Sequence, residues 1–154
     1  MEDVAVLLVD DEPVGTVSLE KKLADQGMRI LTMPNRGDIL SEIEKKHIDV
    51  VILNITLAGT NGLETLRRIK KIDPLVEVIL CTDHADLSLA IQGMEIGAFD
   101  YILKSITPEE LVYTVTDAYQ RKSLQEEKIK KLKHTFDKNK RTYKPKKGES
   151  AGDL

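Results

Sequence analysis

The sequence has a single cysteine and no long apolar run, and each absence excludes a class of protein. Cys81 alone cannot form a disulfide framework within one chain, which fits a reducing compartment. No stretch of about eighteen apolar residues is present, so we expect no membrane span. The N-terminus, MEDVAVLLVDDE, lacks the basic flank and the small-residue cleavage site of a signal peptide. These absences predict a cytoplasmic protein.

Positive charge is scarce in the first part of the chain and abundant in the last. Residues 1–120 hold 11 Lys and Arg against 21 Asp and Glu, whereas residues 121–154 hold 12 basic and 5 acidic residues. This asymmetry is typical of a folded body followed by an interaction tail, although a solvated linker has the same charge pattern. We predict a domain over residues 1–120, a basic helical extension over 121–141 and a disordered tail over 142–154.

Five short apolar runs alternate with segments of helical spacing. The runs cover residues 5–9, 29–32, 50–53, 77–81 and 101–103, and the segments between them cover 14–26, 36–46, 63–72 and 87–96. A fifth helix is predicted from Pro108 to about residue 140, a length of roughly 50 Å. The alternation predicts an α/β fold, a five-stranded doubly wound parallel sheet in the flavodoxin-like order 2-1-3-4-5 with an extended C-terminal helix.

Polar side chains stand where the predicted strands end. They are Asp10, Asp11, Asn54, Thr82 and Lys104. The ligand crevice of this fold opens at that edge of the sheet. Adjacent carboxylates repel one another and need a counter-charge, either a lysine or Mg²⁺ shared with phosphate oxygens. A structural ion pair explains each residue alone, but the convergence of all five favours a phosphoryl-binding site.

Over about residues 3–120 the chain resembles a CheY-like receiver domain of the two-component response-regulator family. The motifs that carry the resemblance are LLVDDEP, a strand ending in Asn54 and followed by AGTNGLE, VILCT, and GAFDYILK. The resemblance implies a phosphorelay switch that takes a phosphoryl group onto an aspartate of the third strand, with Mg²⁺. By position, the metal ligands would be Asp10, Asp11, Asn54 and the carbonyl of Thr56, the phosphoryl pocket Thr82 and Lys104, and the rotating switch residue Tyr101.

Four departures from the family pattern fall on this site. Asn54 stands at the phosphoacceptor position, Ala58 and Ser105 replace prolines, and Asp83 replaces a small residue. An amide is neutral and its nitrogen lone pair is delocalised, so Asn54 cannot form the acyl phosphate that a carboxylate forms. The lost charge also predicts that Mg²⁺ binding is weakened or absent. Asp83 either opposes an incoming phosphodonor or partly restores the lost charge at the metal.

Three interpretations of Asn54 follow. The protein is a natural pseudo-receiver that works through unmodified contacts, or Asn54 is an engineered block of phosphorylation, or another acid, Asp83 or Asp11, accepts the phosphate. An enzyme is not expected. A flavin phosphate site conflicts with the two anions of DDEP, and a phosphohydrolase using Asp10 as nucleophile would have to show turnover of a phosphate ester.

The predicted C-terminal helix carries a seam of 4-3-4-3 spacing, made of Leu111, Val115, Ala118, Lys122, Gln125, Ile129, Leu132 and Phe136. The first three residues are expected to pack on the sheet. The last three could pair with a second copy or a partner helix, unless the helix frays unpaired. The basic extension permits contact with nucleic acid or acidic lipid by charge, but it lacks a module that reads DNA sequence.

We therefore predict a stand-alone signalling module that acts by protein–protein contact. The expected surface is formed by the fourth helix, the fifth strand and the fifth helix. The expected partners are a histidine kinase or another signalling protein, with a homodimer through the last helix as a further option. The alternatives are an ordinary Mg²⁺-dependent receiver in which Asn54 replaces the acceptor aspartate, and a dimerising scaffold.

Overall fold

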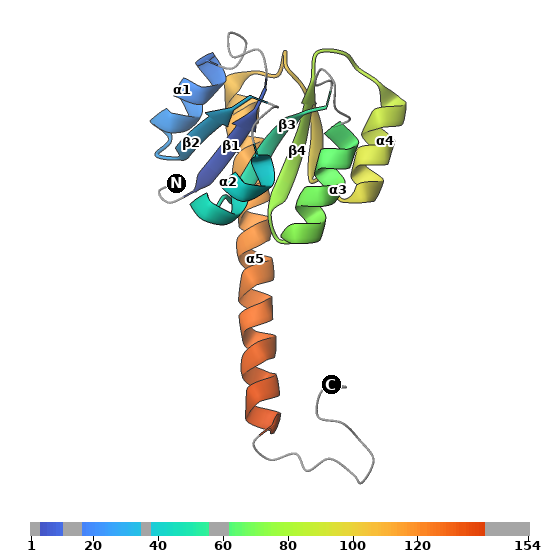
Figure 1. Cartoon of the computed structure of the whole chain (residues 1–154). Coiled ribbons are helices and arrows are strands. Elements are labelled where there is room, and N and C mark those ends of the chain that lie inside the picture. The colour runs from blue at the N-terminus through green and yellow to red at the C-terminus, as the bar shows by residue number, and fades with distance from the viewer. Residues whose placement is uncertain (1–3, 11–16, 35–37, 56–61, 141–154) are drawn as a thin grey trace. The chain divides into compact units, whose positions relative to one another are not determined.

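The computed structural model describes residues 4–10, 17–34, 38–55 and 62–140. Within these ranges five strands alternate with five helices (Figure 1). The strands are β1 (Ala5–Val9), β2 (Arg29–Met33), β3 (Val50–Asn54), β4 (Glu77–Thr82) and β5 (Asp100–Leu103). The helices are α1 (Val17–Asp25), α2 (Ile39–Lys46), α3 (Gly62–Ile72), α4 (Leu87–Ile96) and α5 (Pro108–Lys140).

All strand pairs are parallel, and the order across the sheet is β2-β1-β3-β4-β5. This order confirms the predicted doubly wound, flavodoxin-like topology. A parallel sheet of this kind is covered on both faces, which explains the nearly continuous Val, Ile and Leu of its central strands. β1, β3 and β4 are buried along their whole length.

Alternate residues of each strand face two separate cores. Leu7, Val51 and Leu80 belong to the cluster that includes α2 and α3 residues, and Leu89 and Ile96 of α4 pack against it. Val6, Ile52 and Ile79 belong to the other cluster, with residues of α1 and α5. The helices therefore cover the sheet in two layers, with α2, α3 and α4 on one face and α1 and α5 on the other.

The predicted strand ends were too early by one residue at Asn54, Thr82 and Met33, and the last strand begins one residue earlier, at Asp100. At Asn54 and Thr82 the reason is that a polar residue at the end of an apolar run still pairs with the neighbouring strand. Asn54 is paired in register with Cys81, and Thr82 with Leu103. Two site residues therefore belong to strands and not to loops.

Helix boundaries also differ from the apolar pattern. α2 begins at Ile39 because the carboxylate of Asp38 caps it, accepting a hydrogen bond from the Ser41 amide at 3.1 Å. α3 begins at Gly62, one residue before the predicted start, and a Cβ there would lie 2.5 Å from the Ile55 Cα. Glycine thus lets α3 start directly against the residue that follows β3. The predicted helix starts at residues 14 and 36 lie outside the described residues.

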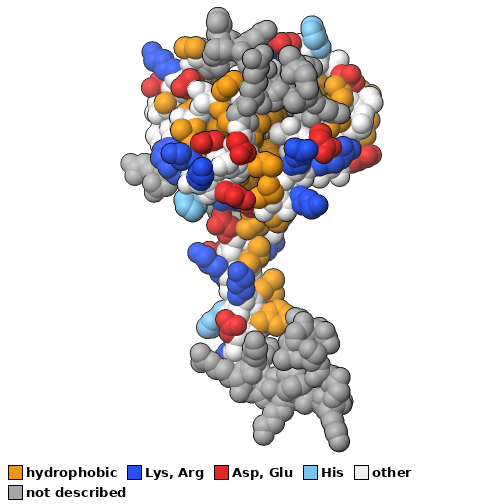
Figure 2. All heavy atoms as spheres, in the orientation of Figure 1, with side chains coloured by type: hydrophobic (Ala, Val, Ile, Leu, Met, Phe, Trp, Pro, Cys, Tyr) orange, Lys and Arg blue, Asp and Glu red, His pale blue; other side chains and the backbone are white. Residues whose placement is uncertain are grey.

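The chain divides into two compact units, Met1–Lys122 and Ser123–Leu154. α5 contributes to both. Its residues Leu111, Val115 and Ala118 are fully buried in the first unit, as the seam predicted. In the second unit, Leu132 and Phe136 are exposed, and Figure 2 shows basic and apolar side chains along this helical part. The predicted disordered tail lies outside the described residues, and the division at residue 120 stays a prediction.

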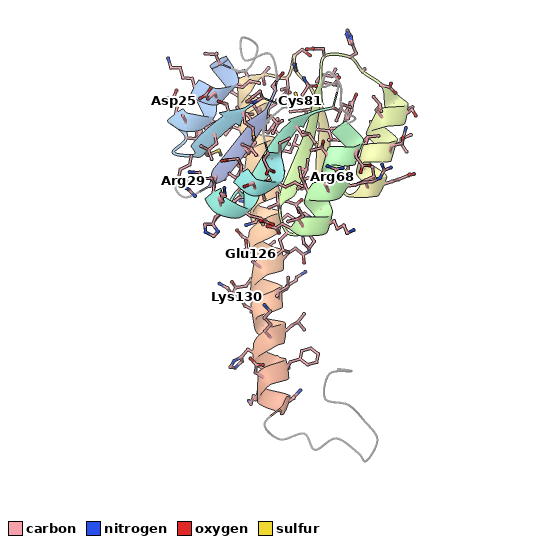
Figure 3. All side chains as sticks on the ribbon, in the orientation of Figure 1. Asp25, Arg29, Arg68, Cys81, Glu126 and Lys130 are labelled. Carbon is pink, nitrogen blue, oxygen red and sulfur yellow. The ribbon has the colours of Figure 1, made fainter. Side chains whose placement is uncertain are left out.

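Glu126 and Lys130 stand one turn apart on the same side of α5 (Figure 3), a spacing that favours attraction between opposite charges on a helix.

Within the described ranges, no helix combines the length and the apolar character that a membrane crossing needs.

Candidate functional site

The carboxyl ends of four strands bring the predicted site residues to one edge of the sheet. Asp10 directly follows β1, Asn54 and Thr82 end β3 and β4, and Lys104 directly follows β5. Asp11, Thr56 and Ala58 lie outside the described residues. The structure therefore describes four of the predicted pocket residues, and these four come from the strands that the topology places side by side.

Asp10 stands between two donors. Its Oδ2 lies 2.9 Å from Lys104 Nζ, and its Oδ1 accepts a hydrogen bond from the Asn54 amide nitrogen at 3.3 Å. The Asp10 side chain is only 8% exposed, so these contacts are screened little by water. Each oxygen of this carboxylate is thus engaged by a nitrogen donor of the protein.

Lys104 lies between two acids. Its Nζ is 3.6 Å from Asp83 Oδ2 in addition to its closer contact with Asp10. Burial alone would lower the pKa of Lys104. The hydrogen bond and charge of Asp10, together with the charge of Asp83, outweigh burial and raise the pKa of the ammonium above its ordinary value. Sequence reasoning placed Asp83 near the pocket but missed this pairing with Lys104.

Thr82 is 1% exposed and is fixed by its neighbours. Its hydroxyl oxygen accepts a hydrogen bond from the His84 amide at 3.3 Å, and its carbonyl accepts one from the Lys104 amide at 2.8 Å. The end of β4 therefore holds both the loop that follows it and the backbone of Lys104.

Tyr101 connects β5 with the loop between β4 and α4. Its hydroxyl donates to the His84 carbonyl and accepts from the Asp86 amide, both at 3.2 Å. Asp86 is in turn the N-cap of α4, with its carboxylate accepting from the Leu89 amide at 3.1 Å. One phenol thus joins the pocket strand to the start of α4, while the role of Tyr101 as a rotating switch stays a prediction.

Cys81 lies inside the sheet (Figure 3). The strand register pairs it with Asn54 of β3. Cys81 is 5% exposed. Burial, together with the negative charges of Asp10 and Asp83, raises the pKa of the thiol to about 11, against the opposing effect of the Lys104 charge. Cys81 belongs to the core cluster that includes residues of α1 and α5, and at neutral pH it stays a thiol.

The described part of the predicted magnesium set does not fit the ion in this arrangement. Mg²⁺ requires oxygen ligands in an octahedral shell, whereas both oxygens of Asp10 face nitrogen donors and Asn54 turns its amide nitrogen to Asp10. Among the described residues there is no group of three or more His, Cys, Asp or Glu that could hold a metal.

The family model of the response regulator receiver domain matches residues 6–116 of the chain. The chain belongs to this family. The match begins at the second residue of β1 and spans the other four strands and the first turns of α5, so it covers every described residue of the pocket. It establishes a receiver domain of a two-component response regulator.

Individual response regulators are also similar to this chain in sequence. The receiver is 35% identical over 113 residues to the DNA-binding transcriptional regulator NtrC of Salmonella typhimurium, covering 73% of this chain and 24% of that protein. It is 32% identical over 140 residues to a putative response regulator NtrX-like protein of Rickettsia conorii, covering 90% of this chain and 30% of that one. The chain thus spans 24% and 30% of the length of these two curated relatives.

Solved structures show the same fold. A response regulator receiver domain protein from Clostridium thermocellum superposes with a TM-score of 0.73 at 34% identity, covering 79% of this chain and 98% of that one. NtrX from Brucella abortus superposes with a TM-score of 0.77 at 28% identity, covering 86% of this receiver and 30% of that chain.

Proposed function

We propose that this receiver is a pseudo-receiver, a non-enzymatic signalling module in which Asn54 at the phosphoacceptor position prevents phosphorylation. The observation that carries the proposal is the hydrogen bond from the Asn54 amide nitrogen to Asp10 Oδ1 at 3.3 Å. An aspartate at this position would place a second anion against Asp10 and would need a cation between them. Asparagine replaces that repulsion by an attraction and offers no anionic oxygen to a phosphodonor.

We further propose that Lys104 takes over the charge balance of the pocket. Its ammonium contacts Asp10 at 2.9 Å and Asp83 at 3.6 Å. With one cation between two carboxylates and a neutral amide at residue 54, the described groups hold one another without a divalent ion. Binding of Mg²⁺ is accordingly weakened or absent in this proposal, because the ion would have to displace the lysine from Asp10.

Output then depends on surface contacts. The face of α4, β5 and α5 is the proposed surface, because α4 exposes the large apolar side chains of Leu87 (76% exposed), Ile91 (49%) and Met94 (47%). Ala90, Ile91, Met94 and Glu95 line a shallow apolar hollow on this helix. The two elements that follow α4 in the chain also expose apolar side chains, Leu103 on β5 and Tyr113 on α5. Apolar patches of this kind are typical of interaction sites.

The proposed partner is a histidine kinase or another signalling protein, in the cytoplasm. The NtrC relatives are named DNA-binding transcriptional regulators, and we propose that any DNA output of this receiver is delivered by another domain or protein. A scaffold that dimerises through α5 is a second candidate. It is favoured by the exposed Leu132 and Phe136, which lie four residues apart on one side of the helix.

The proposal is tested by intact mass after incubation with Mg²⁺ and a small-molecule phosphodonor, with Asn54→Asp run beside the unaltered chain. We expect no phosphate on the unaltered chain and one on Asn54→Asp. If neither chain gains phosphate, the changes at Asp83, Ala58 and Ser105 have also disabled the site, and the pseudo-receiver proposal stands. Phosphate on the unaltered chain would overturn it, and fragment masses would then show whether Asp83 or Asp11 is the acceptor.

A further inference from the structure

A second charged cluster lies at the opposite, amino edge of the sheet. Asp49 precedes β3 and Glu77 begins β4, and the two are adjacent because the Glu77 amide donates to the Asp49 carbonyl at 3.2 Å. Glu77 is 5% exposed, and the Asp49 side chain is 14% exposed. Two carboxylates with so little access to water require charge partners.

Two consecutive residues of α5 supply these partners. Lys122 Nζ donates to Asp49 Oδ1 at 2.8 Å, while Asp49 Oδ2 accepts from the Ala5 amide at 2.9 Å. Arg121 Nη1 lies 3.8 Å from Glu77 Oε2, and its guanidinium carbon lies 5.9 Å from the centre of the Phe99 ring. Arg121 and Lys122 thus reach separate acids at the starts of neighbouring strands.

The contact of Arg121 with Glu77 is electrostatic and not a hydrogen bond. Within the part of the chain that the structure describes, Glu77 Oε2 is buried and accepts no hydrogen bond. Lys70 of α3 lies 3.9 Å from Oε1, but its ammonium donates to the carbonyls of Pro74 and Val76, both at 2.9 Å. Arg121 is therefore the cation nearest to Oε2, and Lys122–Asp49 is the stronger of the two contacts made by α5.

These contacts stand where the buried stripe of α5 ends. Leu111, Val115 and Ala118 are completely buried, and the next residue of the same 4-3-4 spacing is Lys122, whose side chain is 13% exposed. The first compact unit also ends at Lys122. The buried apolar surface of this stripe holds α5 on the sheet, and the ion pair at its end adds a contact that depends on the positions of two charged groups.

We propose that Arg121 and Lys122 form a clasp that holds α5 on the amino ends of β3 and β4, and that opening the clasp frees this part of α5 while the sheet stays folded. β3 and β4, together with β5, which directly follows Phe99, carry the pocket at their other ends. Asp49, Glu77 and Phe99 each stand five positions before a pocket residue, namely Asn54, Thr82 and Lys104. The clasp and the pocket therefore lie about 17 Å apart along shared strands, and the clasp is a conformational device distinct from the phosphoryl pocket.

Hydrogen–deuterium exchange of the full chain tests the clasp. The double variant Asp49→Asn with Lys122→Met removes both charges, so no unpaired ion is left buried, and the side-chain amide introduced at position 49 keeps an acceptor for the Ala5 amide. We expect peptides covering residues 116–130 to exchange about tenfold faster, and peptides of β1, β3 and β4 to change by less than about twofold. Lys122→Met and Arg121→Met alone are expected to change the same peptides in the same direction.

Lys22→Met is the matched control, because Lys22 pairs with Glu109 at 3.1 Å in the first turn of α5 but at an exposed position. This variant is expected to leave residues 116–130 unchanged. Faster exchange confined to α5 in the double variant supports the clasp. Unchanged exchange in α5, or an equal acceleration in the strands, overturns it, since the ion pairs would then be dispensable or would serve overall stability only.

Discussion

Lys104 Nζ lies 2.9 Å from Asp10 Oδ2, closer than the 3.6 Å that separates it from Asp83 Oδ2. Lys104 therefore makes its closer contact with the buried Asp10 and its weaker contact with the half-exposed Asp83. With the Asn54 amide on the other Asp10 oxygen, the described part of the pocket is held together by protein groups. Stability measurements can test this arrangement directly.

Lys104→Met is expected to lower the free energy of unfolding by about 3 kcal/mol, because it leaves Asp10 buried without its cation. Urea denaturation at neutral pH measures this change. Arg67→Met is the control, since Arg67 pairs with Glu64 at 3.4 Å with both side chains more than half exposed. That variant is expected to change stability by less than about 0.5 kcal/mol. Equal losses in the two variants would contradict the importance of the Lys104–Asp10 contact.

Asn54→Asp is expected to lower the unfolding temperature in the absence of divalent ions, because it replaces the amide donor beside Asp10 by a second anion. A loss of about 1 kcal/mol corresponds to a shift of roughly 4 °C. Mg²⁺ is expected to raise the unfolding temperature of this variant and to leave that of the unaltered chain unchanged, by mass action on the folded state. The same rise in both chains would show that Asn54 does not weaken metal binding.

Tyr101→Phe removes the hydroxyl that joins His84 and Asp86. We expect a loss of about 1 kcal/mol, the usual net contribution of such hydrogen bonds. Amide exchange should accelerate at Asp86 and in the first turn of α4, because the loop loses its tie to β5. Nuclear magnetic resonance of the amide protons measures both effects, and an unchanged Asp86 amide would show that the hydroxyl does not hold the loop.

Glu77→Gln tests the amino-edge cluster by pH. Burial, which outweighs the charges of Lys70 and Arg121, raises the pKa of Glu77 above its ordinary value of 4.5. The protonated form is therefore favoured by folding, and the stability it contributes is fully present below pH 4.5 and is lost as pH rises through the folded pKa. The variant, which cannot ionise, is expected to gain stability relative to the unaltered chain between acidic and neutral pH. A pH-independent difference in denaturation midpoint would contradict the raised pKa.

The fold could be predicted from the sequence because strand composition and helix start residues are both local signals. Runs such as 50–53 and 77–81 mark buried strands by composition, and Pro108 marks the start of α5. The convergence of Asp10, Asn54, Thr82 and Lys104 followed from topology, since parallel strands end at the same edge.

The side-chain pairing was less accessible to sequence reasoning. Asp83 contacts Lys104 from twenty-one positions away in sequence, a distance at which charge patterns say little about partners. The amino-edge cluster was missed altogether, although two signals were present. Glu77 opens a strand whose next four residues are apolar, and Lys122 interrupts the apolar seam of α5. The ion-pair partner of each of these charged residues is distant in sequence, so it can be identified only once the fold is known.

The burial of Cys81 has a practical consequence for experiments on α5. With a pKa of about 11, only about one thiol in ten thousand is ionised at neutral pH, and the side chain is shielded from reagents as well. Because this is the chain's only cysteine, a new cysteine placed at an exposed helix position such as Phe136 would react with a maleimide probe selectively. Fluorescent or spin labels can therefore be attached at single chosen sites without first removing the native thiol from the core.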